Sequence, residues 1–156
     1  MSEQTLHIRD GGPADADTVI RFNIACAHES EDLALDPAIV APGVRAVLGD
    51  PARGRYFIAE DGAGPAGQVM ITFEWSDWRN AWIWWLQSVY VRADARRRGV
   101  FGALYDHVEN AAREAGVAAI RLYVDRDNER AERTYLRAGF EHAHYRLLEK
   151  PLTDGA

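Results

Sequence analysis

The sequence has a single cysteine, Cys26, and no apolar run that approaches the ~20 residues of a membrane-spanning helix. One cysteine excludes a framework of intrachain disulfides, and no set of cysteines and histidines has the spacing of a zinc site. The first residues, Met-Ser-Glu-Gln, lack the basic and apolar regions of a secretory signal peptide. We therefore expect a cytoplasmic protein that binds no metal and no membrane.

Positive charge is also scarce, because 18 Lys and Arg face 24 Asp and Glu, for a net charge of −6. This acidic balance argues against a protein that binds nucleic acid in general. The charges are unevenly divided: residues 1–78 carry 5 Arg and 13 acidic residues, whereas residues 79–156 carry 13 basic and 11 acidic residues. The division suits an anionic ligand on one half and a cationic ligand on the other, although solvated surface charge sorted by chance explains it too.

The 156 residues, 47% of them apolar, are enough for one domain with a real hydrophobic core, and we find no internal repeat or long linker. We therefore expect a single domain over residues 1–156. In the first half, alternating and helical apolar patterns predict strands and helices in the order strand, two helices, three strands. The expected ranges are strand 6–9, helices 14–29 and 37–48, and strands 55–59, 67–75 and 82–91.

The second half is predicted to alternate between helices and strands, over helix 98–115, strand 120–124, helix 128–138 and strand 144–149. A strand, helix and strand in succession form a right-handed crossover, so strand 120–124 should run parallel to strand 82–91. The predicted fold class is therefore α/β, with a mixed central sheet that begins as an antiparallel meander, continues in a βαβ unit and is flanked by helices.

A cluster of arginine and glycine, Arg96-Arg97-Arg98-Gly99, follows a strand and opens a helix. A helix N-terminus presents unpaired N–H groups and a positive dipole end, which favour phosphate. Three arginines at that end oppose the dipole, and a bound diphosphate would relieve the conflict. The alternative interpretation is a solvated run of charge on a turn.

The same residues resemble a known family. Arg96-Arg97-Arg98-Gly99-Val100-Phe101 is similar to the Gln/Arg-x-x-Gly-x-Gly/Ala signature of the GCN5-related N-acetyltransferases (GNAT), and Ser88-Val89-Tyr90-Val91 to the strand before it. Asn128-x-x-Ala131-x-x-x-Tyr135-x-x-x-Gly139-Phe140 resembles the family's second signature. The sixth signature position departs from the pattern, since it holds Phe101 and the glycine follows as Gly102.

The resemblance implies acetyl transfer from acetyl-CoA, or from another acyl-CoA, to a primary amine of a small molecule or peptide. It implies that two strands splay apart to admit the pantetheine arm, and that backbone groups of Val89 and Val91 meet the acyl carbonyl and pantetheine. The residues that it marks as cofactor-binding are Val89, Tyr90, Val91, Arg96, Arg97, Arg98, Gly99, Val100, Gly102 and Asn128.

Two residues are predicted to carry the proton transfers. The resemblance implies that Tyr135 is the general acid for the departing thiolate, since a phenol can donate that proton; by position alone, a core aromatic beside Leu136 and Phe140 is the alternative. No motif marks the general base. Glu74, between Phe73 and Trp75, is the first candidate if an apolar surround raises its pKa, and an exposed carboxylate at the end of a strand is the alternative. Weaker candidates for the base are His28, Glu29 and Asp77.

The five tryptophans fall between residues 75 and 85, with Trp82 and Trp84 expected on one strand face and Trp85 on the other. Packing explains them, and an acceptor pocket, a homodimer interface or a partner-binding module are the alternatives. The acidic residues 29–32 with Asp36 would favour a cationic amine acceptor, or are ordinary surface charge. A CoA-binding sensor or scaffold without catalysis remains the alternative to an enzyme.

Overall fold

The computed structural model describes residues 5–154. The chain forms two compact units, of which the first ends at Asp125 and the second begins at Arg126. The expectation of one domain over residues 1–156 stays a prediction. The N-terminal Met-Ser-Glu-Gln, on which the expectation about a signal peptide rests, lies outside the described residues.

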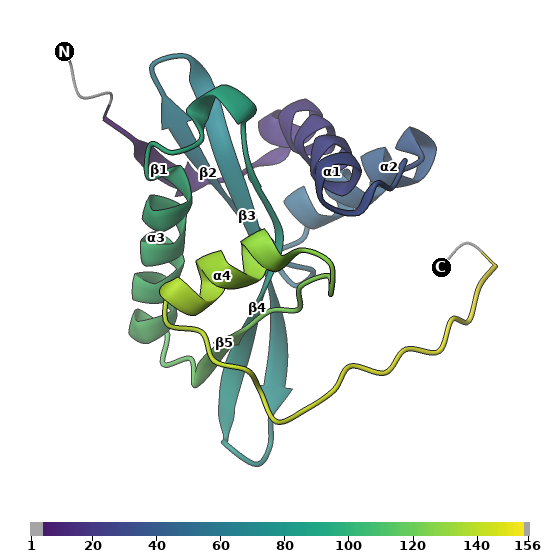
Figure 1. Cartoon of the computed structure of the whole chain (residues 1–156), viewed down its shortest axis with the longest axis vertical. Coiled ribbons are helices and arrows are strands. Elements are labelled where there is room, and N and C mark those ends of the chain that lie inside the picture. Colours follow the sequence, from purple (N-terminus) through teal and green to yellow (C-terminus); the bar gives the residue numbers. More distant parts are fainter. Residues whose placement is uncertain (1–4, 155–156) are drawn as a thin grey trace. The chain divides into compact units, whose positions relative to one another are not determined.

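A five-stranded sheet with the order β1-β2-β3-β4-β5 forms the centre of the first unit (Figure 1). Neighbouring strands from β1 to β4 run antiparallel, and β5 runs parallel to β4. The predicted α/β fold, with an antiparallel meander followed by a βαβ unit, is therefore confirmed. The strands are β1 (His7–Asp10), β2 (Arg55–Asp61), β3 (Gly64–Ser76), β4 (Ala81–Val91) and β5 (Ala119–Arg121).

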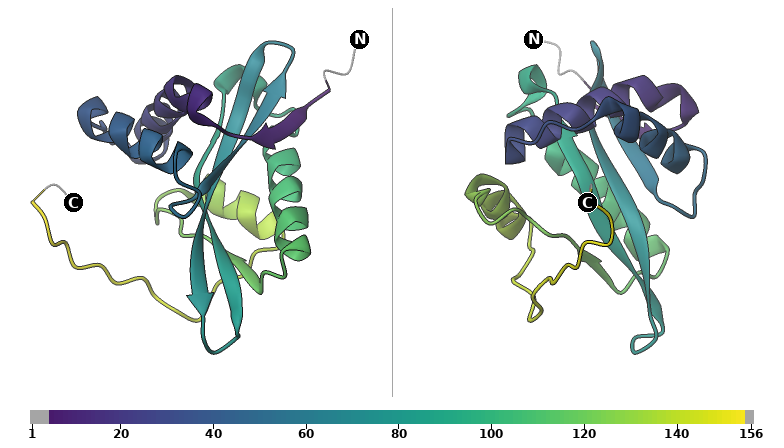
Figure 2. Two further views of the ribbon diagram at one scale, coloured as in Figure 1. Left: turned by 180° about the vertical axis from the view of Figure 1, so that it is seen from behind. Right: turned by 90° about the vertical axis from the view of Figure 1, so that its right-hand side faces the viewer.

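Helices cover both faces of this sheet: α1 and α2 lie on one face and α3 on the other (Figures 1 and 2). On the first face, Val19 and Val44 pack with Tyr56 and Met70. On the second face, the ring of Phe57 lies 5.1 Å from that of His107. The helices of the unit are α1 (Ala16–Glu31), α2 (Pro37–Leu48) and α3 (Val100–Glu114), with 3-10 turns η1 (Pro13–Asp15) and η2 (Ala93–Ala95).

The two helical layers explain why the centre of β2 is apolar without alternation. Residues 56–59 are all at most 3% exposed, because side chains on both faces of the strand meet a helix. A strand covered on one face only would alternate apolar and polar residues, as a half-buried strand does. The hydrophobic core of the first unit therefore consists of two layers with the sheet between them.

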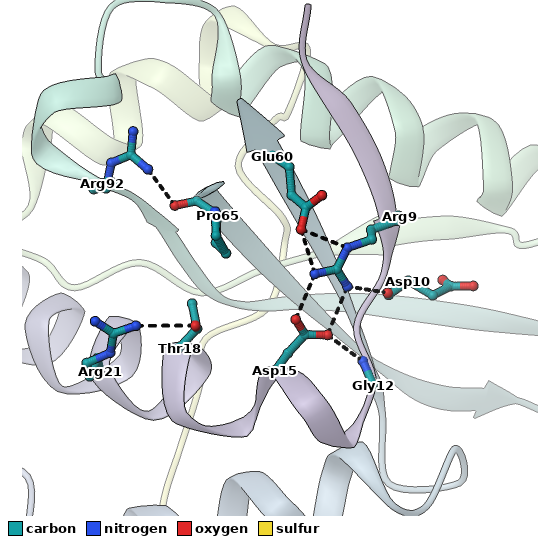
Figure 3. Close-up of polar contacts among 9 residues, drawn as sticks. All are labelled: Arg9, Asp10, Gly12, Asp15, Thr18, Arg21, Glu60, Pro65 and Arg92. Atoms are coloured by element: carbon teal, nitrogen blue, oxygen red, sulfur yellow. Dashed lines mark hydrogen bonds and ion pairs between the residues drawn. The ribbon is translucent and has the colours of Figure 1, made fainter. Parts of the chain in front are cut away.

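Arg9 of β1 forms hydrogen-bonded ion pairs with the turn before α1 and with β2 (Figure 3). The guanidinium of Arg9 donates to both carboxylate oxygens of Asp15, at 2.7 and 2.9 Å, and to Glu60 at 2.8 and 3.0 Å. Asp15 also accepts from the backbone N–H of Gly12, at 2.8 Å. The hydrogen bonds from Arg9 hold the pKa of Asp15 below its usual value, in spite of burial. This network fixes the position at which α1 begins.

The helix expected to begin at residue 98 begins at Val100 instead. Arg97 and Gly99 have φ angles of +63° and +77°, in the left-handed region, which is incompatible with a right-handed helix. At the other end, α3 stops at Glu114, and Gly116 adopts a φ of +71°, as expected of a glycine that terminates a helix.

The second unit contains one helix, α4 (Glu129–Arg137), among its described residues. The strand expected over residues 144–149 was a wrong prediction, since those residues have no regular secondary structure. A strand needs a partner for its backbone hydrogen bonds, and no strand of residues 5–154 pairs with this segment. Nor does its apolar pattern form a buried face, because Leu147 and Leu148 are 68% and 91% exposed. The strand expected over residues 120–124 is also shorter, and ends at Arg121.

Candidate functional site

The start of α3 has the geometry of an anion site. The first hydrogen bond across the helix start joins the N–H of Ala103 to the carbonyl of Gly99, at 3.0 Å. The N–H groups of the preceding turn, such as those of Val100 and Gly102, therefore precede the intrahelical ladder. Such N–H groups, together with the positive end of the helix dipole, favour a phosphate.

Two glycines keep this helix start open. A Cβ atom placed on Gly99 or on Gly102 would meet no other atom within 4 Å, so packing does not explain either glycine. Gly99 is explained by its left-handed φ of +77°, whereas Gly102 lies inside a regular helix. Phe101, at the departing signature position, stacks along the helix on Tyr105, with ring centroids 6.3 Å apart. A bare backbone at Gly102 is what an approaching diphosphate requires, so the residues present fit such a group.

Arg92 anchors the loop that leads from β4 into this helix. Its guanidinium donates to the carbonyl of Pro65 at 2.7 Å (Figure 3) and to Asp61 at 2.9 Å. It also pairs with Asp94 inside the loop. The backbone N–H of Arg92 donates to the carbonyl of Ala66 at 2.8 Å. The adjoining ends of β2 and β3 therefore fix the point from which the arginine-rich loop begins.

The three arginines of the loop have different surroundings. All three are exposed. Arg96 donates to Glu29 of α1 at 2.9 Å and to the carbonyl of Val91 at 3.0 Å, with its guanidinium 5.6 Å from the centroid of the Tyr90 ring. Arg96 would have to exchange Glu29 for a diphosphate in order to contact one. The ion pair with Glu29 also joins the end of α1 to the loop that follows β4.

The outer half of β4 has an irregular edge. Pairing between β4 and β5 runs from Ile83 to Trp85 and stops there, so that no strand of residues 5–125 pairs with residues 86–91 on that side. On the other side, the register between β3 and β4 shifts, since Gln68 faces Tyr90 while Met70 faces Gln87. Two residues, Ser88 and Val89, therefore lie opposite one residue of β3, which is a β-bulge. The splayed strands that the family resemblance implies stay a prediction, and the pairing of β4 with β5 stops at Trp85.

Two backbone carbonyls at this edge of β4 already accept hydrogen bonds from side chains of the protein. The carbonyl of Val89 accepts from the thiol of Cys26, at 3.4 Å, and the carbonyl of Val91 accepts from Arg96. Burial raises the pKa of the Cys26 thiol, which keeps the proton that it donates. An acyl carbonyl needs a donor, so the N–H groups, and not these carbonyls, are the backbone groups suited to bind it.

Glu74 lies in a more polar place than the sequence suggested. Its carboxylate accepts from the indole N–H of Trp85 at 2.9 Å and from Arg121 at 3.3 Å. The expected apolar surround was wrong, because Phe73 and Trp75 alternate with Glu74 along the strand and point to the opposite face of the sheet. Trp85 precedes Val89 by four residues, about 13 Å along a strand, so proton transfer from that end would need intervening water.

The weaker candidates for the base have other surroundings. Glu29 pairs with Arg96, and His28 is exposed at the same end of α1. Asp77 accepts from the backbone N–H of Trp78 at 3.0 Å, in the turn between β3 and β4. Asp36 accepts from the backbone N–H of Ala38 at 2.9 Å and so caps α2.

The tryptophans form a ladder at the β3–β4 hairpin. Trp82 and Trp84 share one face of β4, as predicted, and both pack edge-on against Phe73, with ring centroids 6.5 and 6.1 Å apart. Trp84 is buried, whereas Trp75 and Trp82 are about half exposed and Trp78 in the turn is 92% exposed. Trp85 lies on the other face and bonds Glu74. Packing in the core therefore explains Trp84. It does not explain Trp75, Trp78 and Trp82, which are exposed at the end of the hairpin.

The second unit holds the two remaining predicted residues. The side-chain oxygen of Asn128 accepts from the backbone N–H of Ala131 at 3.2 Å and caps α4. Tyr135 lies seven residues later, two turns along the same helix face, and is half-buried. Its ring packs edge-on against Phe140, with centroids 5.7 Å apart. The contact with Phe140 supports the alternative that Tyr135 is a core aromatic. The catalytic role of Tyr135 stays a prediction.

A buried polar cluster under the bulge escaped the sequence analysis. Gln68 is fully buried, and its amide donates to Asn23 at 2.7 Å and to the carbonyl of Ser88 at 3.0 Å. The sequence did contain a signal for this cluster: Gln68 lies in the middle of an apolar strand, and a buried amide needs hydrogen-bond partners inside the protein. The partners themselves lie 45 and 20 residues away, and no periodicity reveals them.

Neither a metal centre nor a membrane span is found in the part of the chain that the structure describes. No three His, Cys, Asp or Glu side chains of residues 5–154 gather closely enough to hold a metal ion. Over the same residues, no helix combines the length and the apolar character needed to cross a membrane.

Comparisons with known proteins agree with this geometry. The model of the acetyltransferase (GNAT) family matches residues 21–140. A possible acetyltransferase from Clostridium difficile 630 has 34% sequence identity and a TM-score of 0.90, over 95% of this chain and 98% of that one. No curated protein matches the sequence significantly.

Two further solved structures share the fold at lower identity. A ribosomal-protein-alanine N-acetyltransferase from Brucella melitensis is 17% identical with a TM-score of 0.77, over 96% of this chain and all of that one. A predicted acetyltransferase from Clostridium acetobutylicum, solved with acetyl-CoA, is 15% identical with a TM-score of 0.75, over 94% and 96% of the two chains. By the family match over residues 21–140, the chain belongs to the acetyltransferase (GNAT) family.

Proposed function

We propose that this acetyltransferase moves the acetyl group of acetyl-CoA to a primary amine of a small molecule or peptide, by direct attack within a ternary complex. The observation that carries the proposal is the start of α3, where Gly99 and Gly102 leave an open helix N-terminus beside an arginine-rich loop. The similar acetyltransferase from Clostridium acetobutylicum, solved with acetyl-CoA, supports the choice of coenzyme.

The diphosphate of the coenzyme binds the N–H groups at the start of α3, with Arg97 and Arg98 adding positive charge nearby. Arg96 joins them by leaving Glu29, which then lies without its cation at the end of α1. The pantetheine arm follows the half of β4 that β5 does not pair, between residues 86 and 91. The second signature supports Asn128 as a further residue that binds pantetheine.

The acyl carbonyl accepts a hydrogen bond from the N–H of Val89 at the bulge. The amine nitrogen attacks the thioester carbon, a C–N bond forms and the C–S bond breaks, and CoA leaves as a thiolate. A cationic amine gives up one proton before it attacks, for which Glu74 is the first candidate, through water, and the nitrogen gives up a second proton to water as the amide forms. The thiolate takes one proton, and the second signature supports Tyr135 as its donor.

The acceptor is a cationic amine, such as a polyamine, an amino sugar or a peptide N-terminus. Carboxylates at the end of α1 support this choice, among which Glu31 and Asp32 are exposed. The acetyltransferase from Brucella melitensis, described as acting on a ribosomal protein's alanine, keeps a peptide N-terminus among the candidates.

The experiment that tests the proposal incubates the full chain with acetyl-CoA and a panel of amines, and measures free thiol and the mass of the products. We expect thiol release that depends on one class of amine and that yields its N-acetyl derivative. Binding of acetyl-CoA without transfer to any amine would favour the sensor or scaffold function. Absence of binding would favour a partner-binding module built on the exposed tryptophans.

A further inference from the structure

The bulge in β4 depends on an unfavourable backbone conformation. Ser88 has a φ of +52°, and it is the one residue other than glycine, within the strands of residues 5–154, that adopts the left-handed region. A serine does not hold this conformation by itself, because its Cβ disfavours it. Some group outside β4 must therefore fix Ser88, and with it the direction of the next peptide group.

Gln68 of β3 provides that group. Its side-chain N–H₂ donates both to the carbonyl of Ser88, at 3.0 Å, and to the side-chain oxygen of Asn23, at 2.7 Å. The orientation of the amide is determined, since a backbone carbonyl can only accept, and Asn23 uses its own N–H₂ to donate to Tyr56 at 3.0 Å.

The orientation leaves the other atom of the amide without a partner. The oxygen of Gln68 is buried and accepts no hydrogen bond. A buried acceptor without a donor opposes folding, so stability alone does not favour a glutamine here. The same residue nevertheless gives both its donors to Asn23 and Ser88, which is the arrangement expected where a local backbone geometry is held for function.

The cluster connects the bulge to α1. Asn23 and Cys26 lie one turn apart on that helix, and the Cys26 thiol bonds the carbonyl of Val89, the second residue of the bulge. The two carbonyls of the bulge, those of Ser88 and Val89, are therefore held from β3 and from α1 respectively. With both carbonyls fixed, the N–H between them, that of Val89, has a fixed direction as well.

We propose that Gln68 is a positioning residue, which holds the Ser88 carbonyl so that the N–H of Val89 points at the acyl carbonyl of the bound thioester. The inference rests on the proposed acetyl transfer, because Val89 matters only if a thioester lies along β4. Gln68 acts through Val89 and touches no substrate itself.

The test compares Gln68→Met with Tyr56→Phe in the full chain. Gln68→Met keeps the length of the side chain and removes both donors. Tyr56→Phe is the matched control, because it removes the hydroxyl that accepts from Asn23 while the bond from Gln68 to Ser88 stays. For Gln68→Met we expect kcat to fall by roughly 10- to 100-fold, as for a misplaced catalytic donor. The Kd of Gln68→Met for CoA without an acyl group should stay within about 2-fold of wild type. For Tyr56→Phe we expect both this Kd and kcat to stay close to wild type.

A second measurement needs no substrate. Hydrogen exchange of the peptide spanning residues 86–91 should become faster in Gln68→Met and stay unchanged in Tyr56→Phe, with α3 unaffected in both. If Gln68→Met does not fold, Gln68→Asn, whose amide is one methylene too short to reach Ser88, takes its place in both measurements.

The outcomes separate this inference from the proposed function. If wild type releases no thiol with any amine, the proposed function fails, and exchange over residues 86–91 still decides whether Gln68 holds the bulge. If wild type is active and the Gln68 variant loses no more kcat than Tyr56→Phe, or exchanges no faster over residues 86–91, Gln68 is not a positioning residue.

Discussion

At the scale of single residues, the hydroxyl of Tyr135 is the group whose loss should separate chemistry from binding. Tyr135→Phe keeps the ring and its edge-on contact with Phe140. As a general acid, the hydroxyl should contribute roughly 10²- to 10⁴-fold to the rate. We expect turnover to fall by that factor, while the Kd for CoA and the melting temperature stay close to wild type.

Steady-state kinetics and thermal melting of the same preparation measure both quantities. Turnover near that of wild type would remove Tyr135 from the reaction, and the thiolate would then take its proton from water. A lower melting temperature with normal turnover would show that the hydroxyl serves folding alone.

Glu74 can be tested by its charge. Glu74→Gln keeps the size of the side chain and an oxygen for the indole of Trp85, but cannot take a proton from an amine. We expect kcat/KM to fall at neutral pH, by about 10²-fold for a lost general base, and the limb of the pH–rate profile that reports the base to disappear.

The matched control is Arg121→Met, which removes the cation beside Glu74 and leaves the carboxylate in place. It should keep most of the activity at neutral pH, because the carboxylate that takes the proton stays. An unchanged profile in Glu74→Gln would assign the base elsewhere, with Glu29 next in line once Arg96 has left it.

At the scale of elements, the start of α3 carries the coenzyme. Gly99→Glu places a carboxylate where the diphosphate binds, so it should weaken CoA affinity by at least about 10-fold, by repulsion and by competition for the same N–H groups. Gly116→Glu at the opposite end of the helix is the control, since Gly116 has a similar φ of +71° and equally open surroundings. Both variants should lose stability from the strained backbone, and Gly116→Glu should lose more, because a carboxylate opposes the negative end of the helix dipole.

Calorimetric titration of CoA into the two variants distinguishes the effects. Equal affinities would mean that the diphosphate binds away from α3. Sequence spacing located this element because the signature, the glycines and the helix period agree over residues 96–115. The residue types did not reveal that the helix starts two residues later, because the delay depends on left-handed φ angles at both Arg97 and Gly99, and only glycine favours that region.

The last predicted strand shows the opposite case. The alternation over residues 144–149 satisfies the pattern of a strand, yet a strand exists only where another strand supplies hydrogen bonds, and a pattern carries no information about the partner. The strand β4 was predicted within one residue, but its bulge was not, since the bulge depends on Gln68, Asn23 and Cys26, which lie far from Ser88 in sequence.

At the scale of the whole molecule, fold class and family were predictable because order, spacing and signatures agree over most of the chain. The environment of Glu74 was not, because Trp85 and Arg121 reach it from two other strands. The uneven division of charge along the sequence agrees with the position of the basic loop, residues 96–98, in the second half of the chain. It did not indicate that Arg96 is paired with Glu29 from the acidic half.

Thermal melting of the full chain against acetyl-CoA concentration measures whether this chain binds the coenzyme. A ligand at ~100 times its Kd stabilises the folded state by roughly 2.7 kcal/mol. For a chain of this size, that corresponds to a rise in melting temperature of roughly 5 to 10 °C. We expect such a rise, saturating with concentration and smaller in Gly99→Glu at the same acetyl-CoA concentration; no rise in wild type at millimolar acetyl-CoA would show that the chain does not bind it.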